Sequence, residues 1–365
     1  MTTGNDTLAE LRAQFPVVQR LAYLNAGTNG PIATAAADAV AAQQQRETEE
    51  GRGGMPFFLA YQEQADRLRA GYAAYLHATP EEVALTTSTT DGVSRILLAL
   101  NLGAGDEILT SDEEHPGVYG PLVAQRARGV SVRTAPFASL AEAIAPATKL
   151  VVASHVSWRS GAYAPIAALA AAEPLLLLDG AQGVGAVPTD VHALGADFYA
   201  GAGQKWLCGP TGTGMLWIHP RVRERLAVPS PGYLNLADAG AGLDAVPRED
   251  AQAFDTPSLS STGIVHAVAM LDLFAASGWD AIHARAHDLA ELAVAQLRER
   301  GREVLARDRT TLVTWREAGA PEQTEKLLEA GVVVRHLPDE DVLRASFGGW
   351  SSEQDLERLL DALPA

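Results

Sequence analysis

The sequence predicts an α/β fold in which helices cover both faces of a mostly parallel, seven-stranded sheet, with a smaller α+β unit after it. Between residues 83 and 218, short apolar runs alternate with alanine-rich segments, a pattern typical of parallel strands connected by helices. After residue 229 a stretch rich in glycine and proline is followed by a second set of strands and helices. A chain of 365 residues is also long enough for two hydrophobic cores.

Three helices are expected before the sheet. They fall at residues 7–15, 34–50 and 61–78, and the glycine-rich segment 51–54 separates the last two. The seven strands share a short apolar core bounded by polar residues or glycine. They are expected at residues 83–85, 107–110, 130–134, 150–154, 174–178, 198–200 and 214–218, with a helix at 91–100 and alanine-rich helices between the four strands from 107–110 to 174–178.

The second unit begins after a connection at residues 229–242. Its helices are expected at residues 263–275, 282–300, 322–330 and 352–363, and its strands at 312–315, 332–335 and 342–347. We therefore expect a large domain at residues 26–235 and a small domain at 236–365. The N-terminal segment, residues 1–25, is expected to pack on the small domain.

Composition excludes several classes of function. The formal net charge of −17 disfavours nucleic acid and anionic membranes as partners, because both require clustered Lys and Arg. The single cysteine, Cys208, excludes an internal disulfide. Residues 1–19 lack the apolar core of a signal peptide, and no apolar run reaches the length of a membrane helix, so a cytoplasmic protein is expected.

The strongest chemical signal is a lysine within a glycine-rich stretch, Asp-Phe-Tyr-Ala-Gly-Ala-Gly-Gln-Lys-Trp-Leu-Cys-Gly-Pro-Thr-Gly-Thr-Gly, residues 197–214. Lys205 is one of only three lysines in the chain. A lysine amine becomes nucleophilic when an apolar pocket or nearby cations lower its pKa, and it can then form an imine with an aldehyde. An isolated Gly-x-Lys is more often a surface lysine, but this stretch is much longer.

Three further elements accompany the lysine. Asp179 follows an apolar strand, where a carboxylate points into the ligand crevice of an α/β sheet and can pair with a protonated pyridine nitrogen. The hydroxyl-rich residues 86–90 precede a helix, and helix N-termini bind phosphate. His115 follows another strand and could stack on a ring. Each element alone is common in helix caps or loops, so their combination matters.

With these four elements in this order, the sequence resembles the class V aminotransferase family of fold type I pyridoxal 5′-phosphate (PLP) enzymes. The resemblance covers nearly the whole chain and implies that Lys205 is the Schiff-base lysine. It also implies that Asp179 pairs with the pyridine nitrogen, that Gln182 hydrogen-bonds the ring hydroxyl and that His115 stacks on the ring. The residues implied to bind the phosphate end are Ser88, Thr89, Thr90, Gln204 and, from the other subunit of a homodimer, Ser258.

Two departures and one closer likeness qualify this resemblance. The family usually has Ser or Thr, Gly and His before the lysine, whereas this chain has Ala202, Gly203 and Gln204. Within the family the chain is most similar to cystine C–S lyases, through Glu-His-Pro-Gly-Val, Ser-His-Val-Ser-Trp and Val-Arg-His-Leu-Pro-Asp-Glu-Asp-Val-Leu-Arg. This likeness implies four substrate-binding residues: Asn25, Trp158, Arg335 for a second carboxylate and Arg344 for the α-carboxylate.

The expected reaction is β-elimination from cystine or a cysteine conjugate, because elimination requires only a leaving group at Cβ. Epimerisation, as in isopenicillin N epimerase, and transamination stay open. Persulfide-forming desulfuration is disfavoured, because the family places its mobile cysteine in the C-terminal domain and this chain has none there. A non-enzymatic, ligand-binding module is disfavoured by the intact Lys205. His283 and His287 lie one helical turn apart without an apparent third ligand, so no metal is expected.

Overall fold

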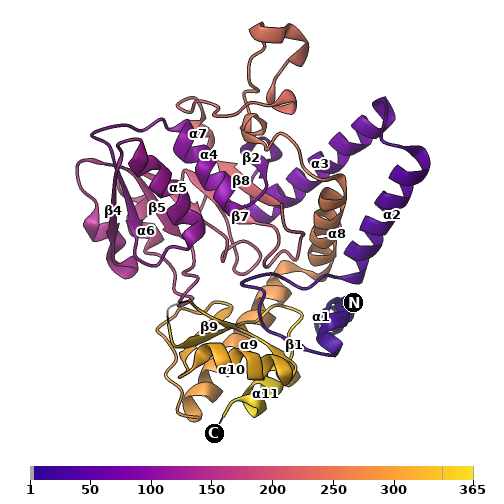
Figure 1. The fold of residues 1–365 in the computed structure, drawn as a ribbon, viewed down its shortest axis with the longest axis vertical. Coiled ribbons are helices and arrows are strands. Elements are labelled where there is room, and N and C mark those ends of the chain that lie inside the picture. The colour runs from indigo at the N-terminus through magenta and orange to yellow at the C-terminus, as the bar shows by residue number, and fades with distance from the viewer. Residues whose placement is uncertain (1–3, 339, 365) are drawn as a thin grey trace.

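The computed structural model describes residues 4–338 and 340–364 and shows a large sheet domain above a smaller C-terminal unit (Figure 1). The large sheet has seven strands in the order β2-β8-β7-β6-β5-β3-β4. All pairs are parallel except those of β8, which runs antiparallel to β2 and β7. The predicted fold class and strand count are therefore confirmed. The strands are β2 (Val83–Thr86), β3 (Glu107–Ser111), β4 (Ser131–Ala135), β5 (Thr148–Ser154), β6 (Leu175–Asp179), β7 (Phe198–Ala202) and β8 (Gly214–Ile218).

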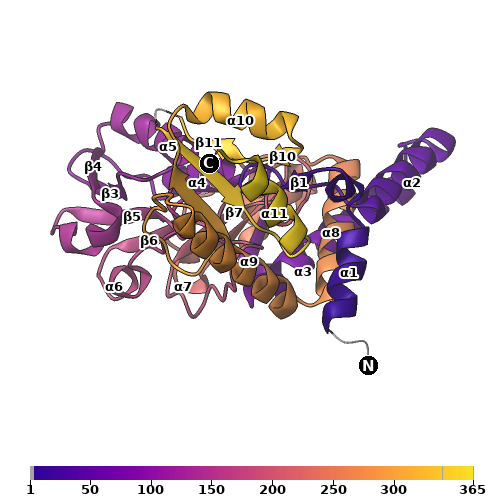
Figure 2. The ribbon, with the colours of Figure 1, turned by 90° about the horizontal axis from the view of Figure 1, so that it is seen from below.

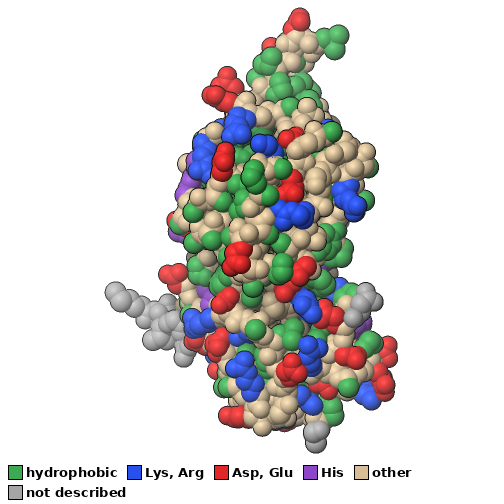
Figure 3. Space-filling model, turned by 90° about the vertical axis from the view of Figure 1, so that its left-hand side faces the viewer, with side chains coloured by type: hydrophobic (Ala, Val, Ile, Leu, Met, Phe, Trp, Pro, Cys, Tyr) green, Lys and Arg blue, Asp and Glu red, His purple; other side chains and the backbone are tan. Residues whose placement is uncertain are grey.

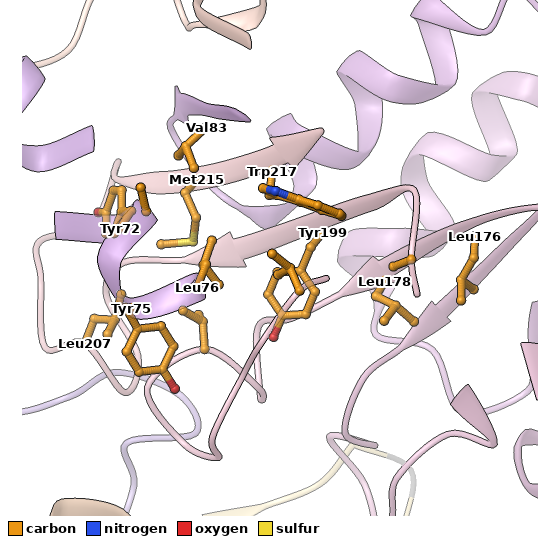
Figure 4. Packing of buried hydrophobic residues seen from close by; sticks show 14 of the residues in the cluster. Tyr72, Tyr75, Leu76, Val83, Leu176, Leu178, Tyr199, Leu207, Met215 and Trp217 are labelled. Atoms are coloured by element: carbon orange, nitrogen blue, oxygen red, sulfur yellow. The ribbon is translucent and has the colours of Figure 1, made fainter. Parts of the chain in front are cut away.

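Alternate residues of these strands enter two different cores, as the period of two in a strand requires. Leu176, Leu178, Tyr199 and Trp217 point to one face (Figure 4), which is covered by α3 (Met55–Leu76), α6 (Ile166–Ala170) and α8 (Ser261–Ser277). The opposite face is covered by α4 (Thr89–Ala99), α5 (Pro116–Ala127) and α7 (Pro220–Arg223). The inner strands β5 to β8 are therefore buried on both faces, which explains why they are mostly apolar, whereas the edge strand β4 is largely exposed or half-buried.

The C-terminal unit has an antiparallel sheet, β11-β12-β9, made of β11 (Arg335–His336), β12 (Val342–Ser346) and β9 (Leu312–Arg316). The helices α9 (Trp279–Glu299), α10 (Ala320–Glu329) and α11 (Glu353–Ala362) belong to this unit (Figure 2). A separate two-stranded sheet pairs β1 (Ala22–Tyr23) in parallel with β10 (Val332–Val333). The chain before residue 26 is thus hydrogen-bonded to the C-terminal unit.

The N-terminal helices form the remaining layer. α1 (Gly4–Ala13) lies against α8 and α9, and Arg12 pairs with Asp355 of α11 at 2.7 Å. α2 (Thr34–Glu50) and α3 form a hairpin, and α8 packs on both of them. The boundary at residues 235 and 236 stays a prediction. Within the described residues no single helix is long and apolar enough to cross a membrane, although α8 and α9, bent by 84°, pass that test as a pair.

Two sequence predictions are wrong in detail. The strand expected at residues 332–335 is divided into β10 and β11, which join different sheets. Between β6 and β7, residues 180–197 form turns. Packing there is close: a Cβ on Gly180 would lie 2.2 Å from the Tyr199 ring, and one on Gly183 would lie 2.5 Å from His155 Nδ1. α3 also begins at Met55, six residues before the predicted start.

A segment at residues 229–250 projects from the large domain at the top of Figure 1. It contains short turns of 3-10 helix, at Tyr233–Asn235 and Ala239–Asp244. Leu243 and Val246 are exposed there, and hydrophobic side chains gather at the top of the space-filling view (Figure 3).

Candidate active site

The expected site residues meet at one edge of the large sheet. Because β2, β3, β5, β6 and β7 run in the same direction, their C-terminal ends lie together, where α/β sheets bind ligands. The residues that follow these ends carry the chemistry. They are Ser88 to Thr90 after β2, His115 after β3, Trp158 after β5, Asp179 at the end of β6 and Lys205 after β7.

Lys205 and Asp179 influence each other's ionisation. Burial lowers the pKa of Lys205 to about 8, an effect that Asp179 opposes and that Arg344 and Arg335 reinforce. Burial raises the pKa of Asp179, against the attraction of Lys205 and a hydrogen bond from Ala181 N at 2.7 Å. A lysine with a lowered pKa has a larger neutral, nucleophilic fraction near pH 7. Lys205 can therefore react with an aldehyde, and the Asp179 carboxylate can pair with a cationic group of a ligand.

His115 is the N-cap of α5, and its Nδ1 accepts a hydrogen bond from Gly117 N at 3.0 Å. The proton of the neutral ring therefore lies on Nε2. Burial lowers the pKa of His115 to about 4, with further lowering by Lys205, Arg335 and Arg344. Its ring meets the Trp158 ring edge-on, with centroids 5.1 Å apart. At neutral pH this side chain is an uncharged, fixed aromatic surface.

Two glutamines lie near the lysine: Gln182 in the turn after β6, and Gln204 directly before Lys205. The Gln182 amide is held by protein groups: Nε2 donates to Gly27 O at 2.8 Å, and Oε1 accepts from Trp206 Nε1 at 2.9 Å. One Nε2–H of Gln182 stays available for a ligand hydroxyl. The Gln204 Oε1 atom is buried without a hydrogen-bond partner, while the backbone O of Gln204 accepts from Gly30 N at 2.8 Å.

The hydroxyl-rich segment forms the N-terminus of α4. Ser88 is its N-cap and accepts from Asp91 N at 3.1 Å, so this hydroxyl caps the helix. Thr89 Oγ1 is buried without a partner. Thr90 lies against the α5 N-terminus, since its Oγ1 would be 2.6 Å from a Cβ on Gly117. The expected anion site is therefore built from two helix N-termini that touch.

Arg344 and Arg335 lie directly opposite each other on β12 and β11. Arg344 is 1% exposed, donates to Trp158 O at 2.6 Å and leaves its Nε without a partner. Burial and Arg335 lower the pKa of Arg344 to about 9, which keeps it charged at neutral pH. Among residues 4–338 and 340–364, no carboxylate lies within salt-bridge distance of either guanidinium. Like charges face to face are unfavourable, so the pair is arranged for an anionic ligand.

The remaining expected residues lie at the margin of this edge. Arg335 Nη1 donates to Thr28 Oγ1 at 3.1 Å, and Thr28 in turn donates to Asn25 Oδ1 at 2.8 Å. Asn25 is thereby connected to Arg335 through one hydroxyl. Ser258 is exposed in the single chain and stands apart from this network.

Glu114 is a buried acid that the sequence interpretation did not single out. It is 2% exposed and accepts from Ser111 Oγ at 2.5 Å and from Ser154 Oγ at 2.6 Å. Burial raises the pKa of Glu114 to about 7, and Asp179 adds to this rise. The available signal was its position next to His115, directly after a buried strand. Glu114 ties the ends of β3 and β5 together beside Asp179.

Unpartnered buried polar atoms test whether a cofactor fits here. Besides Thr89 Oγ1 and Gln204 Oε1, they include Trp158 Nε1, Arg344 Nε and Ser346 Oγ. Buried polar atoms normally have hydrogen-bond partners, so their concentration at this edge indicates a polar ligand. An aldehyde, a pyridine nitrogen and a phosphate match the lysine, the aspartate and the α4 N-terminus. The donor set thus fits PLP.

Comparison with known proteins agrees with this chemistry. The family model described as aminotransferase class V matches residues 33–359. The isopenicillin N epimerase of Streptomyces clavuligerus is 28% identical over 98% of this chain and 97% of its own length. A probable cysteine desulfurase of Methanothermobacter thermautotrophicus is 25% identical over 72% of this chain and 69% of the relative.

Solved structures of the protein C-DES are also similar. One is a lysine-to-alanine mutant with glycine covalently linked to the PLP cofactor; it has a TM-score of 0.90 and 27% identity, covering 96% of this chain and 98% of C-DES. Another, described as the cystine C–S lyase C-DES in complex with its reaction product cysteine persulfide, has a TM-score of 0.89 and 26% identity, covering 95% of this chain and 98% of C-DES.

Proposed function

Because the chain belongs to the aminotransferase class V family of PLP-dependent enzymes, we propose that it is a C–S lyase acting on cystine or a related sulfur amino acid by β-elimination. The observation that carries this proposal is that buried Arg344 and half-buried Arg335 face each other and offer two cationic groups to one ligand. Cystine has two α-carboxylates, so it can use both. The similarity to C-DES, named as a cystine C–S lyase, supports the same substrate class.

The residues of this chain have separate tasks in such a reaction. PLP, when bound, supplies an electron sink that stabilises negative charge at the substrate Cα. Asp179 would hold the pyridine nitrogen in its protonated form, and His115 would present an uncharged ring to the cofactor. Lys205 Nζ would hold the cofactor's aldehyde, and once the substrate amine has replaced it there, the free amine, with a pKa of about 8, would be the base for the Cα proton.

Arg344 orients the substrate through its α-carboxylate. A guanidinium and a carboxylate form two parallel hydrogen bonds, which fix direction as well as position. Arg344 already donates one N–H to Trp158 O, so its plane is set before the substrate arrives. Fixing the carboxylate in this way determines which Cα substituent faces Lys205.

Cys208 does not supply a nucleophile in this proposal. The thiol is buried, and burial raises its pKa well above the ordinary value, so it is held as the unreactive thiol. The thiol packs against the backbone of Gly30: a Cβ on that glycine would lie 2.5 Å from Cys208 Sγ. Elimination needs no protein thiol.

An epimerase is the second candidate. The specific observation is that the isopenicillin N epimerases of Streptomyces clavuligerus and Amycolatopsis lactamdurans match at least 97% of this chain and of their own length. An epimerase shares the Cα deprotonation step but returns a proton to the opposite face. It releases no product from Cβ.

A product assay distinguishes the two reactions. The PLP-loaded protein is incubated with L-cystine and with S-methyl-L-cysteine, and pyruvate, ammonia and the enantiomers of the amino acid are measured. A lyase forms pyruvate and ammonia in equal amounts from cystine. Formation of the D-enantiomer without pyruvate would contradict the lyase and favour the epimerase.

A further inference from the structure

The loop after β5, residues 157–163, joins the large sheet to the C-terminal unit. Three of its backbone carbonyls accept hydrogen bonds from side chains of β12, β9 and the segment before β9, so the loop and the small sheet are held as one piece. The pairs are Trp158 O with Arg344 Nη1 at 2.6 Å, Arg159 O with Thr314 Oγ1 at 2.7 Å and Gly161 O with Thr310 Oγ1 at 2.8 Å.

The side chain of Arg159 makes the outer contact of this loop. Its Nε and Nη2 bind both carboxylate oxygens of Glu340, at 2.6 and 2.7 Å. Glu340 lies in the turn between β11 and β12, the hairpin that carries Arg335 and Arg344. Arg159 Nη1 also lies 3.8 Å from Glu113 Oε1, in the loop that leads to His115. The Arg159 guanidinium therefore joins two walls of the candidate active site: the β11–β12 hairpin on one side and the loop that leads to His115 on the other.

We propose that Arg159 is a positioning residue: its contacts with Glu340 and Glu113 clamp the β11–β12 hairpin against the Trp158 loop and thereby set the site's affinity for carboxylates. This inference rests on the part of the proposed function that assigns Arg344 to a substrate carboxylate. It does not depend on which bond is then broken. Arg159 touches neither cofactor nor substrate.

The contact between Arg159 and Glu340 orients the β11–β12 hairpin but contributes little to the stability of the fold. The side chains of Arg159 and Glu340 are 38% and 27% exposed, and partly exposed ion pairs contribute little to stability. A two-bonded guanidinium–carboxylate contact nevertheless restricts the relative orientation of the two loops. Without Arg159 the carbonyl contacts of the loop persist, so the chain still folds, but the hairpin can tilt and move Arg335 and Arg344.

The test measures carboxylate binding without catalysis. The PLP-loaded protein is titrated calorimetrically with glutarate, a dicarboxylate that has no amine and cannot react. Arg159→Ala and Glu340→Gln should each raise the glutarate Kd at least about fivefold, and the double variant should bind no more weakly than Arg159→Ala, since both changes remove the contact between these two side chains. The reversed pair Arg159→Glu with Glu340→Arg should bind glutarate more tightly than either of its two single changes, since it restores this contact although not the one with Glu113.

Arg285→Ala is the matched control. Arg285 binds both oxygens of Glu353, at 2.7 and 2.5 Å, and neither belongs to the two walls of the site. This variant should bind glutarate as the original protein does. Single variants of Arg159 and Glu340 that match the control, or a reversed pair that binds glutarate no more tightly than its two single changes, would overturn the clamp.

Arg344→Lys separates the failure of the clamp from that of the proposed function. If Arg344→Lys weakens glutarate binding while Arg159→Ala does not, only the clamp is wrong. If Arg344→Lys binds glutarate as tightly as the original protein, the carboxylate site itself is wrong and the inference falls with it. Unchanged cofactor absorbance and melting temperature in each variant show that the measured effect is positional.

Discussion

At the scale of single residues, the site combines groups whose ionisation is set by burial and by one another. Lys205, His115 and Arg344 all have lowered pKa values, because each loses hydration and each faces other positive groups. Asp179 is the acid that opposes this trend at Lys205. Lys205, Arg344 and Arg335, opposed by the single carboxylate of Asp179, are suited to an anionic cofactor and substrate.

Lys205→Ala should abolish covalent attachment of the cofactor. The purified protein should be yellow, and the variant should lose the colour because no other buried amine lies beside Asp179 in the described chain. Visible absorbance before and after borohydride reduction, followed by peptide mapping, checks this. Lys149→Ala is the control, since Lys149 is exposed; a reduced label on Lys149 or Lys326 would refute the assignment.

Arg335→Ala should affect cystine more than a monocarboxylate substrate. The Arg335 guanidinium meets an anionic partner only when the substrate has a second carboxylate, and a charge-assisted hydrogen bond of roughly 1.5–3 kcal/mol corresponds to a tenfold or larger loss of kcat/KM. S-Methyl-L-cysteine is the comparison substrate. Arg344→Lys should reduce kcat/KM at least about tenfold for both. Equal losses on both substrates in Arg335→Ala would remove the case for a dicarboxylate site.

At the scale of elements, the turn after β6 is shaped by contacts that residues 180–197 make with β5 and β7. The chain turns sharply because Gly180 and Gly183 pack on Tyr199 and His155, with no room for a Cβ. The turn also fixes Asp179, whose Oδ1 is bound by Ala181 N. This tight turn therefore positions one carboxylate of the candidate active site.

Gly180→Ala should therefore destabilise the protein and weaken cofactor binding together. The new methyl group would lie 2.2 Å from the Tyr199 ring, and overpacking of this kind costs roughly 1–3 kcal/mol. Denaturant unfolding and PLP titration measure the two effects. Gly103→Ala is the control, because a Cβ there meets nothing within 4 Å. Equal stability of the two variants would show that the turn is not tightly packed.

At the scale of the whole molecule, the expected assembly is a homodimer. The projecting segment 229–250 exposes Leu243 and Val246, and Ser258 is exposed rather than joined to its own chain's site. Exposed apolar groups on a projecting segment favour burial against another copy. Sedimentation of the PLP-loaded protein should give the mass of two chains, and Ser258→Ala should weaken PLP binding. A fully active monomer at high dilution would contradict this prediction.

Stability of the whole molecule should fall as the solution becomes acidic, in part through buried imidazoles. Burial, with a contribution from His287, lowers the pKa of His283 to about 4 from 6.5. The unfolded chain binds the proton first, so the native state loses stability as pH falls from about 6.5 to about 4. The difference corresponds to at most about 3 kcal/mol for this group.

His283→Phe should flatten this dependence. His283 Nδ1 is buried without a partner, and Tyr75 OH keeps its bond to Val187 O at 2.7 Å, so an aromatic replacement is tolerated at neutral pH. Melting temperatures of both proteins between pH 7 and pH 4 check the prediction. Parallel curves would show that the His283 side chain does not remain neutral in the fold.

Much of the fold and the chemical part of the site could be predicted from local patterns. Apolar runs of strand length indicated most of the seven-stranded sheet, because a strand buried on both faces is largely apolar. Asp179, His115 and Lys205 could be assigned to one edge, because the ends of parallel strands meet there. These inferences need only residues close in sequence and the direction of the strands.

Tertiary structure alone decided the features that depend on distant contacts. The division of residues 332–335 between two sheets follows from the pairing of β1 with β10, more than 300 residues apart in sequence. Glu114 acquires a pKa of about 7 through burial and the neighbouring Asp179. The contact of Arg159 with Glu340 spans 181 positions. Burial and electrostatic interactions depend on three-dimensional distance, which local sequence patterns do not contain, and for that reason only the packed molecule determined them.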